Sequence, residues 1–294
     1  MRPPDATRRL YRLQEGYARR TYLELAKLWG RFDPFDLDRS WRIAVPRMSV
    51  TLATGMSLAA SDADGYLAAV IAEQGGTAAP TARISPQAFG QLTMDGRQLS
   101  EALYEPVIAA KVAARSQALV MDAGLKRLEQ VVTTQVADAG RQSVATGMTA
   151  RPEITGYTRM LDGDPCSRCV VLAGVTYRWN DGFKRHPMCQ CVHIPKIENV
   201  PGDPTTDPAA YFRSLSEADQ DRVFGQAGAQ ALREGADIGQ VVNARSGMYT
   251  TADGRSVTRQ GRRGDGRLMP EQIYADAADR DEAVDLLREY GYLR

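Results

Sequence analysis

All four cysteines and both histidines of this 294-residue chain lie between residues 166 and 193. The first two cysteines form a C-x-x-C, whose turn can place two thiolates about one metal ion, and the other two form a C-x-C about twenty residues later. Two such pairs on separate hairpins are typical of a closed, tetrahedral zinc site. We therefore predict structural Zn²⁺, with ligands drawn from Cys166, Cys169, His186, Cys189 and Cys191.

Other uses of this cluster stay open at this point. The thiols could staple two hairpins without a metal, either reduced or as disulfides. A catalytic thiol is disfavoured, because no single cysteine stands apart beside an orienting partner. Since zinc takes four ligands, Cys189, Cys191 and His186 compete to complete the set that the C-x-x-C begins. His193 would share a face with Cys189 and Cys191 on an extended segment, and we interpret it as a packed or hydrogen-bonding histidine.

The composition is that of an ordinary globular protein, with 43% hydrophobic and 25% charged residues and a net charge of +1. This balance excludes a global attraction to nucleic acid or to an anionic membrane. Arginines interrupt the N-terminus where a secretory signal needs an apolar core, and no later run is expected to reach the roughly 18 apolar residues of a membrane span. Folding in a reducing cytosol is therefore expected, where paired thiols more often hold a metal than form disulfides.

The first part of the chain is predicted to be a helical arm or bundle, residues 1–145. Residues 5–30 place apolar side chains three and four apart beside a strongly basic polar side and end at a glycine: Leu10, Leu13, Tyr17, Leu25 and Leu28. A second helical stretch, residues 40–73, is expected to kink or break near Pro46. Residues 100–145 predict two helices or one long broken helix.

The rest of the chain is predicted to mix strands and helices. Between residues 151 and 200, the segments "VVLAGVTYRW" and "CVHIP" indicate short strands around turns. Ser216 is expected to cap a helix that Gly235 ends. We predict a cysteine-containing domain over 146–243, and a basic Gly-rich loop with a C-terminal helix over 244–294. The predicted fold class is α+β and mainly helical, with a small zinc-stapled, β-containing module after the long helical region.

The cysteine segment resembles a known family. "CSRCVVLAG" followed by "HPMCQC", and then "PAAYFRSLSEADQDRVFGQAGAQALREG", is similar to the C-terminal domain of the Mu F-like minor head proteins of tailed bacteriophages. The resemblance covers about residues 145–243 and departs from the family at Met188 and Gln190. The matched residues are Cys166, Cys169, Leu172, Gly174, Tyr177, His186, Pro187, Cys189, Cys191, Phe212, Gln220, Phe224, Gly225 and Gly235.

The resemblance implies a structural protein of the phage head rather than an enzyme. Such a protein would be assembled in the host cytoplasm and reside in the virion, inside the capsid near the portal. Its implied partner is the portal protein, with the major capsid or a scaffolding protein as further partners. It would also be packaged with DNA. The resemblance thus implies a minor capsid protein that acts in head morphogenesis.

A zinc-containing nucleic-acid-binding module is the first competing interpretation. A Gly-rich segment near the C-terminus gathers arginines that could contact phosphates nonspecifically: Arg245, Arg255, Arg259, Arg262, Arg263 and Arg267. It carries Tyr249 as its one aromatic residue, which argues against base stacking. The N-terminal helix is basic as well. An ordinary exposed loop and a protein contact are the other interpretations of this segment.

An enzyme, such as a head-maturation protease, is the second competing interpretation. A serine protease needs a histidine base, and both histidines of the chain lie beside the predicted zinc ligands. The sequence contains neither H-E-x-x-H nor the phosphate-binding G-x-x-x-x-G-K-[ST]. We therefore predict no catalytic residues and no enzymatic activity.

Overall fold

A computed structural model describes residues 4–113, 117–161, 165–179, 188–189, 191–197, 206–259 and 267–293. Their contacts divide the chain into two compact units. The bundle unit comprises residues 2–160 and 176–204, and the C-terminal unit comprises residues 161–175 and 205–294. The predicted fold class, α+β and mainly helical, is confirmed. The predicted domain boundaries after residues 145 and 243 stay a prediction.

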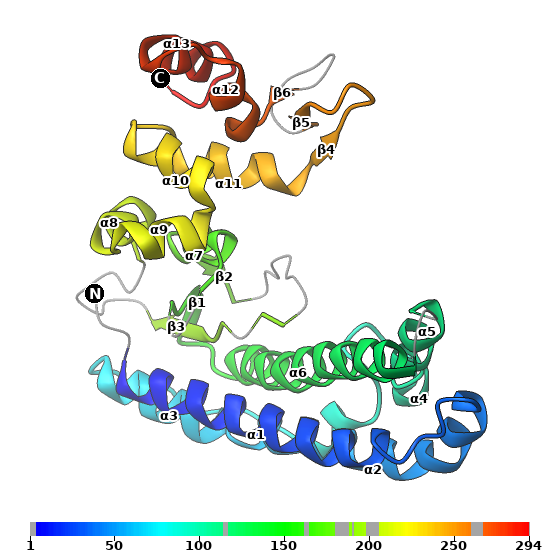
Figure 1. Cartoon of the computed structure of the whole chain (residues 1–294). Coiled ribbons are helices and arrows are strands. Elements are labelled where there is room, and N and C mark those ends of the chain that lie inside the picture. Colours follow the sequence, from blue (N-terminus) through cyan, green and yellow to red (C-terminus); the bar gives the residue numbers. More distant parts are fainter. Residues whose placement is uncertain are drawn as a thin grey trace. The chain divides into compact units, whose positions relative to one another are not determined.

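Long helices build the bundle unit, and α1, α2 and α6 run alongside one another (Figure 1). The faces that these helices turn toward one another form a core that includes the fully buried Leu25, Leu52 and Val132. In chain order the helices are α1 (Asp5–Trp29), α2 (Leu37–Ser61), α3 (Ala63–Glu73), the 3₁₀ helix η1 (Pro86–Gly90), α4 (Leu99–Ala102), α5 (Glu105–Val112) and α6 (Gln117–Thr149).

Glycines allow these long helices to approach closely. A Cβ atom on Gly55 of α2 would lie 2.1 Å from Thr21 Oγ1 of α1. A Cβ atom on Gly124 of α6 would lie 2.0 Å from the indole ring of Trp29. The Trp29 indole also donates a hydrogen bond to the Met121 carbonyl at 3.0 Å. Small residues at both contacts therefore set the spacing of α1 against α2 and α6.

The predicted first helix is confirmed, because α1 begins at Asp5 and ends just before Gly30. Of the kink or break expected near Pro46, the break is wrong, since α2 continues through that residue and ends at Ser61. Proline costs one backbone hydrogen bond, and the buried face of α2 holds the helix together around it. The segment 100–145, predicted as two helices or one broken helix, forms α5 and α6 after the short α4.

The stretch Leu37–Glu73 is long and apolar enough, by length and composition, to cross a membrane. The sequence expectation concerned unbroken apolar runs, whereas this stretch includes polar residues that a span tolerates, so the absence of a membrane span stays a prediction. Core helices of globular proteins pass the same test. Here Met48, Leu52 and Met56 are fully buried in the core of the bundle unit.

A small antiparallel sheet completes the bundle unit, in the order β2-β1-β3. Its strands are β1 (Ile154–Arg159), β2 (Tyr177–Arg178) and β3 (His193–Ile197). Tyr157 of β1 pairs with Tyr177 on one side and Pro195 on the other. The sheet contacts α3 and α6, where Tyr66 of α3 donates a 2.5 Å hydrogen bond to the His193 carbonyl. The predicted "CVHIP" strand is confirmed as β3.

The C-terminal unit consists of short helices and a second antiparallel sheet, in the order β4-β5-β6. The segment that the sequence indicated as a Gly-rich loop contains these three strands. The elements are α7 (Ser167–Ala173), α8 (Pro208–Ser214), α9 (Glu217–Phe224), α10 (Gln226–Arg233), α11 (Ile238–Ser246), β4 (Met248–Thr250), β5 (Ser256–Thr258), β6 (Arg267–Leu268), α12 (Pro270–Asp276) and α13 (Arg280–Glu289).

The predicted helix from Ser216 to Gly235 is two helices. Ser216 caps α9 as expected, because its side chain accepts a hydrogen bond from the Asp219 amide. Gly225 then takes a backbone φ of 72°, which breaks the run before α10 begins. This conformation costs glycine little, whereas other residues rarely adopt it.

Candidate metal centre

The C-x-x-C lies at the N-terminus of α7. Cys166 is the N-cap residue, and its sulfur accepts a hydrogen bond from the Cys169 amide at 3.4 Å. The two sulfur atoms are 3.4 Å apart, and Cys169 is buried. The strands predicted over "VVLAGVTYRW" are therefore wrong for its first half, which is helical in α7, and right for Tyr177–Arg178, which form β2. Burial of Val170 beside Phe212 and Phe224 outweighs the β-branched composition of this segment.

The C-x-C lies just before β3 and is held by α6. The guanidinium of Arg141, itself buried, donates to the carbonyls of Cys189 at 2.5 Å and Cys191 at 3.2 Å. Asp138, one turn earlier on α6, pairs with the same guanidinium. The Met188 amide also donates to Thr134 Oγ1 at 2.9 Å. The backbone that carries these two thiols is thus fixed by charge-assisted hydrogen bonds.

A second buried arginine contacts a thiol directly. Nη2 of Arg159, on β1, lies 3.3 Å from the sulfur of Cys189. Arg159 is only 1% exposed. A guanidinium at this distance stabilises negative charge on the sulfur, which is the form in which cysteine binds metals.

His193 is packed, the role that the sequence interpretation gave it. It is buried on β3, and its ring centroid lies 4.3 Å from that of Tyr157. The Cα partner of His193 in the sheet is Arg159. The other histidine, His186, lies outside the described residues.

The two cysteine pairs belong to different units. Cys166 and Cys169 lie side by side in the C-terminal unit, and Cys189 and Cys191 lie in the bundle unit. No disulfide joins the four cysteines, so all four offer thiol sulfurs, the soft ligands that zinc binds. The full ligand set of the sequence analysis stays a prediction.

The predicted basic segment is only partly a free cationic surface. Arg267 is 3% exposed, and its guanidinium lies 3.5 Å from the centroid of the Tyr292 ring. Burial lowers the pKa of Arg267. Arg255 forms a 2.5 Å ion pair with Asp276, and Arg259 lies over the Tyr249 ring. Arg262 and Arg263 lie outside the described residues.

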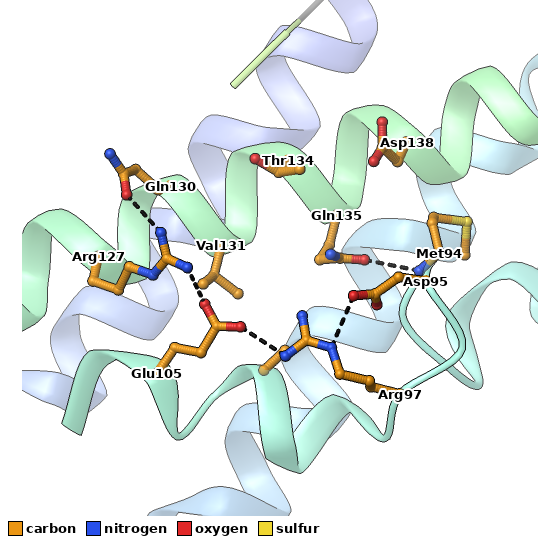
Figure 2. Close-up of a pocket in the computed structure, with 11 residues that line it drawn as sticks. Met94, Asp95, Arg97, Glu105, Arg127, Gln130, Val131, Thr134, Gln135 and Asp138 are labelled. Carbon is orange, nitrogen blue, oxygen red and sulfur yellow. Dashed lines mark hydrogen bonds and ion pairs between the residues drawn. The ribbon is translucent and has the colours of Figure 1, made fainter. Parts of the chain in front are cut away.

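A polar pocket of about 320 Å³ lies in the bundle unit (Figure 2). Glu105 accepts from Arg97 at 2.8 Å and from Arg127 at 2.5 Å, and Arg97 also donates to Asp95. Because both arginines are already matched by carboxylates, the pocket is a network that ties α5 to α6. It is lined by Met94, Asp95, Arg97, Ala102, Glu105, Arg127, Gln130, Val131, Thr134, Gln135 and Asp138.

Arg141 and Arg159, which contact the second cysteine pair, were not among the residues that the sequence pattern predicted. Arginine is rarely buried, so a pattern search places it on a solvated face. The one available signal is the spacing of Asp138 and Arg141, which allows an ion pair on one helix face. That spacing does not indicate which backbone the arginine contacts.

Comparison with known proteins gives one assignment. No curated protein and no solved structure is detectably similar to this chain. One family model does match, over residues 4–218, which include all four cysteines and most of the described helices. On this match, the chain belongs to the VG15 protein family and is a phage-encoded protein.

Proposed function

We propose that the chain is a Mu F-like minor head protein, a structural component of a tailed phage that binds the portal protein during head assembly and stays inside the capsid. The observation that carries this proposal is the match to a phage protein family over a region that includes the cysteine pairs. The sequence resemblance over residues 145–243 supports the same role. The proposal assigns no catalytic step to the chain.

The cysteine cluster takes a structural role in this proposal, with Zn²⁺ as its metal. Cys169, Cys189 and Cys191 would supply thiolate ligands, and Cys166 or His186 the fourth. Bound zinc would crosslink segments that are distant in sequence. Arg159 would offset the negative charge of the thiolates, and Arg141 would orient the backbone of the C-x-C.

The contact with the portal must use exposed residues of the helices. The apolar stripe of α1 is packed within its own unit, since Leu10 and Leu25 are buried. Deleting the first helix would therefore remove core residues as well as any contact surface. Point substitutions at exposed positions are the appropriate test of binding.

The portal proposal is tested by co-expressing this chain with the portal protein of the same phage and capturing one through a tag on the other. We expect the two to be recovered together at constant stoichiometry, and the chain to be detected by mass spectrometry in purified virions. Intact virions that lack the chain would overturn the proposal.

The metal proposal is tested by elemental analysis of protein purified without chelator. We expect about one zinc per chain, and loss of the metal in Cys169→Ser, because the thiolates are the ligands. Val170→Ala is the matched control, since it perturbs the same helix and leaves every thiol in place. Folded, fully reduced protein without metal would contradict the prediction.

A further inference from the structure

One face of α2 is exposed and carries an apolar row. Ile43, Val50 and Leu58 are 73%, 67% and 45% exposed, whereas Met48 and Leu52 on the opposite side are fully buried. The exposed positions fall within about 100° around the helix axis, so they form one surface. We call this surface the outer face of α2; it consists of Arg39, Ile43, Arg47, Val50, Thr54 and Leu58.

The outer face is positively charged. Arg39 and Arg47 are exposed on it, and Arg42 is exposed on its flank. Asp38 is the one acidic residue of α2, and it already accepts hydrogen bonds from Lys111 and Tyr104. Among the described residues, none of these three arginines forms an ion pair. No described ion pair therefore neutralises the charge of this face.

The charge of Arg47 contributes to the lowered pKa of Glu24 on α1, but that carboxylate is engaged by another cation. Its carboxylate accepts a 2.6 Å hydrogen bond from Lys27, and this bond is the main reason for its lowered pKa. Thr54 uses its hydroxyl hydrogen within α2, in a 2.8 Å bond to the Val50 carbonyl. Thr54 therefore offers no hydrogen-bond donor to a partner, and Arg39 and Arg47 of the outer face remain available to the partner's carboxylates.

The pattern fits an acidic helix better than a membrane or a nucleic acid. A helix that lies in a bilayer needs a broad apolar face with its cations at the edge, whereas Arg47 stands between Ile43 and Val50. A nucleic-acid surface is polar and strongly cationic, whereas this row is apolar at its centre. Apolar residues seven and eight positions apart form a narrow seam, and flanking charges select the partner helix.

The geometry points to the outer face of α2 as the docking site for an acidic amphipathic helix of a partner protein. The partner's apolar side chains pack against Ile43, Val50 and Leu58. Its carboxylates pair with Arg39 and Arg47. The identity of that partner as the portal rests on the proposed function, whereas the chemistry of the docked helix does not.

The first test measures capture of the co-expressed portal protein by variants of this chain. Val50→Glu should weaken binding about tenfold, because it places a carboxylate at the centre of the apolar row. Arg47→Glu should weaken it as well and reduce its salt dependence. Val112→Glu is the matched control, since Val112 is 81% exposed on α5 of the same unit and should leave capture unchanged. Equal capture by wild type and Val50→Glu would overturn the outer face of α2 as the contact with the portal and leave the proposed function standing.

The second test does not depend on the portal. A photo-crosslinking residue, p-benzoylphenylalanine, replaces Val50 in phage-infected cells, and the crosslinked peptide is identified by mass spectrometry. An Asp- and Glu-rich helical segment of a head protein is the expected product. If that segment belongs to a head protein other than the portal, the inference holds and the portal is not the partner that docks on this face. Crosslinks to DNA or lipid, or no crosslink at position 50, would overturn the inference.

Discussion

The two units of this chain use helices of very different length. In the bundle unit α1, α2 and α6 contain 25, 25 and 33 residues, whereas the helices of the C-terminal unit contain seven to ten. Isolated helices shorter than about 12 residues are marginal in water. The long helices can therefore rely on continuous buried seams, and the short ones depend on caps, turns and the contacts of individual side chains.

The cores of the two units also differ, in the polarity of the side chains that they bury. Leu25, Met48 and Leu52 are fully buried in a largely aliphatic core of the bundle unit. In the C-terminal unit the fully buried Tyr292 lies under Arg267 and donates a 2.8 Å hydrogen bond to the Leu268 carbonyl. A core of this kind combines apolar packing with polar groups that must keep their partners. Each unit should accordingly be sensitive to a different kind of substitution.

The largest effect is expected from a cavity in the bundle unit. Leu25→Ala should lower the free energy of unfolding by about 3 kcal/mol, because the side chain is fully buried between long helices that cannot collapse around the gap. Urea denaturation followed by circular dichroism measures the change. Leu13→Ala is the control on the same helix, since Leu13 is 40% exposed and should cost little. If the two variants lost equal free energies of unfolding, the buried face of α1 would not be the main source of the stability of the bundle unit.

In the C-terminal unit the corresponding effect should come from a turn. Gly225→Ala should cost about 2 kcal/mol, because the backbone φ of 72° disfavours a side chain and its Cβ atom would lie 2.0 Å from Arg245 Nη2. Arg245 would then lose its 3.2 Å ion pair with Glu271. Hydrogen exchange measured by mass spectrometry should show the loss of protection in α9 and α10.

Gly254→Ala separates the two causes of this loss. Gly254 has a similar φ of 86°, but no atom lies within 4 Å of its added Cβ. Gly254→Ala should therefore lower the free energy of unfolding by only about 1 kcal/mol, which is the cost of the backbone conformation alone. If both variants lost the same free energy of unfolding, the close approach of the added Cβ atom to Arg245 would contribute nothing to the loss.

The contrast between long and short helices also determines which elements could be predicted from the sequence. The long helix α1 was predictable from its apolar spacing and its terminal glycine, since Leu10 and Leu25 are indeed buried. The fold class follows from such patterns. The short α7 was not predictable, because the β-branched residues after Cys169 indicate a strand and only its packing beside Phe212 makes it helical.

The candidate site was predictable in its cysteine pairs and not in the arginines that contact them. Cysteine is a specific residue type, so the C-x-x-C and the C-x-C identify potential ligands from spacing alone. Arginine is common on surfaces, and nothing in the sequence distinguishes the buried Arg141 and Arg159 from solvated ones. Their role depends on contacts between segments far apart in the chain, which local patterns do not encode.

A pH titration tests the polar core of the C-terminal unit. Burial raises the pKa of Tyr292 to about 12, while the charge of Arg267 acts in the opposite direction. An unfolded tyrosine titrates near pH 10, so the folded state holds this proton more tightly. The resulting stabilisation is complete below pH 10 and is lost as the pH rises through 12. Tyr292→Phe should therefore be less stable than wild type by about 1 kcal/mol at pH 8, since the Leu268 carbonyl loses its donor.

The difference between Tyr292→Phe and wild type should narrow above pH 10, because only the wild type then loses the protonated phenol. Urea denaturation at pH 8, 10 and 11 measures it. Phenolate absorbance should also show one fewer late-titrating tyrosine in the variant. A difference that stays constant from pH 8 to 11 would mean that Tyr292 ionises like an exposed tyrosine.

The smallest effect compares one cap in each unit. Ser216 caps the eight-residue α9, and Asp36 caps the 25-residue α2 through a 3.1 Å bond from the Arg39 amide. Ser216→Ala and Asp36→Ala should each cost about 1 kcal/mol, the usual value of an N-cap. The energies should be alike, but the structural responses should differ. Losing the cap of α2 should fray only its first turn, because Met48 and Leu52 anchor the rest of the helix in the core.

For α9 the first turn is nearly half of the helix, and Ser216 also donates a 2.7 Å hydrogen bond to Asp219 Oδ2. Hydrogen exchange should therefore rise along all of α9 in Ser216→Ala, and only near residues 37–41 in Asp36→Ala. Ser216→Thr, which keeps a capping hydroxyl, should restore protection. Exchange confined to the first turn in both variants would show that short helices in this chain are held as firmly by packing as the long ones, and that caps are not what distinguishes the two units.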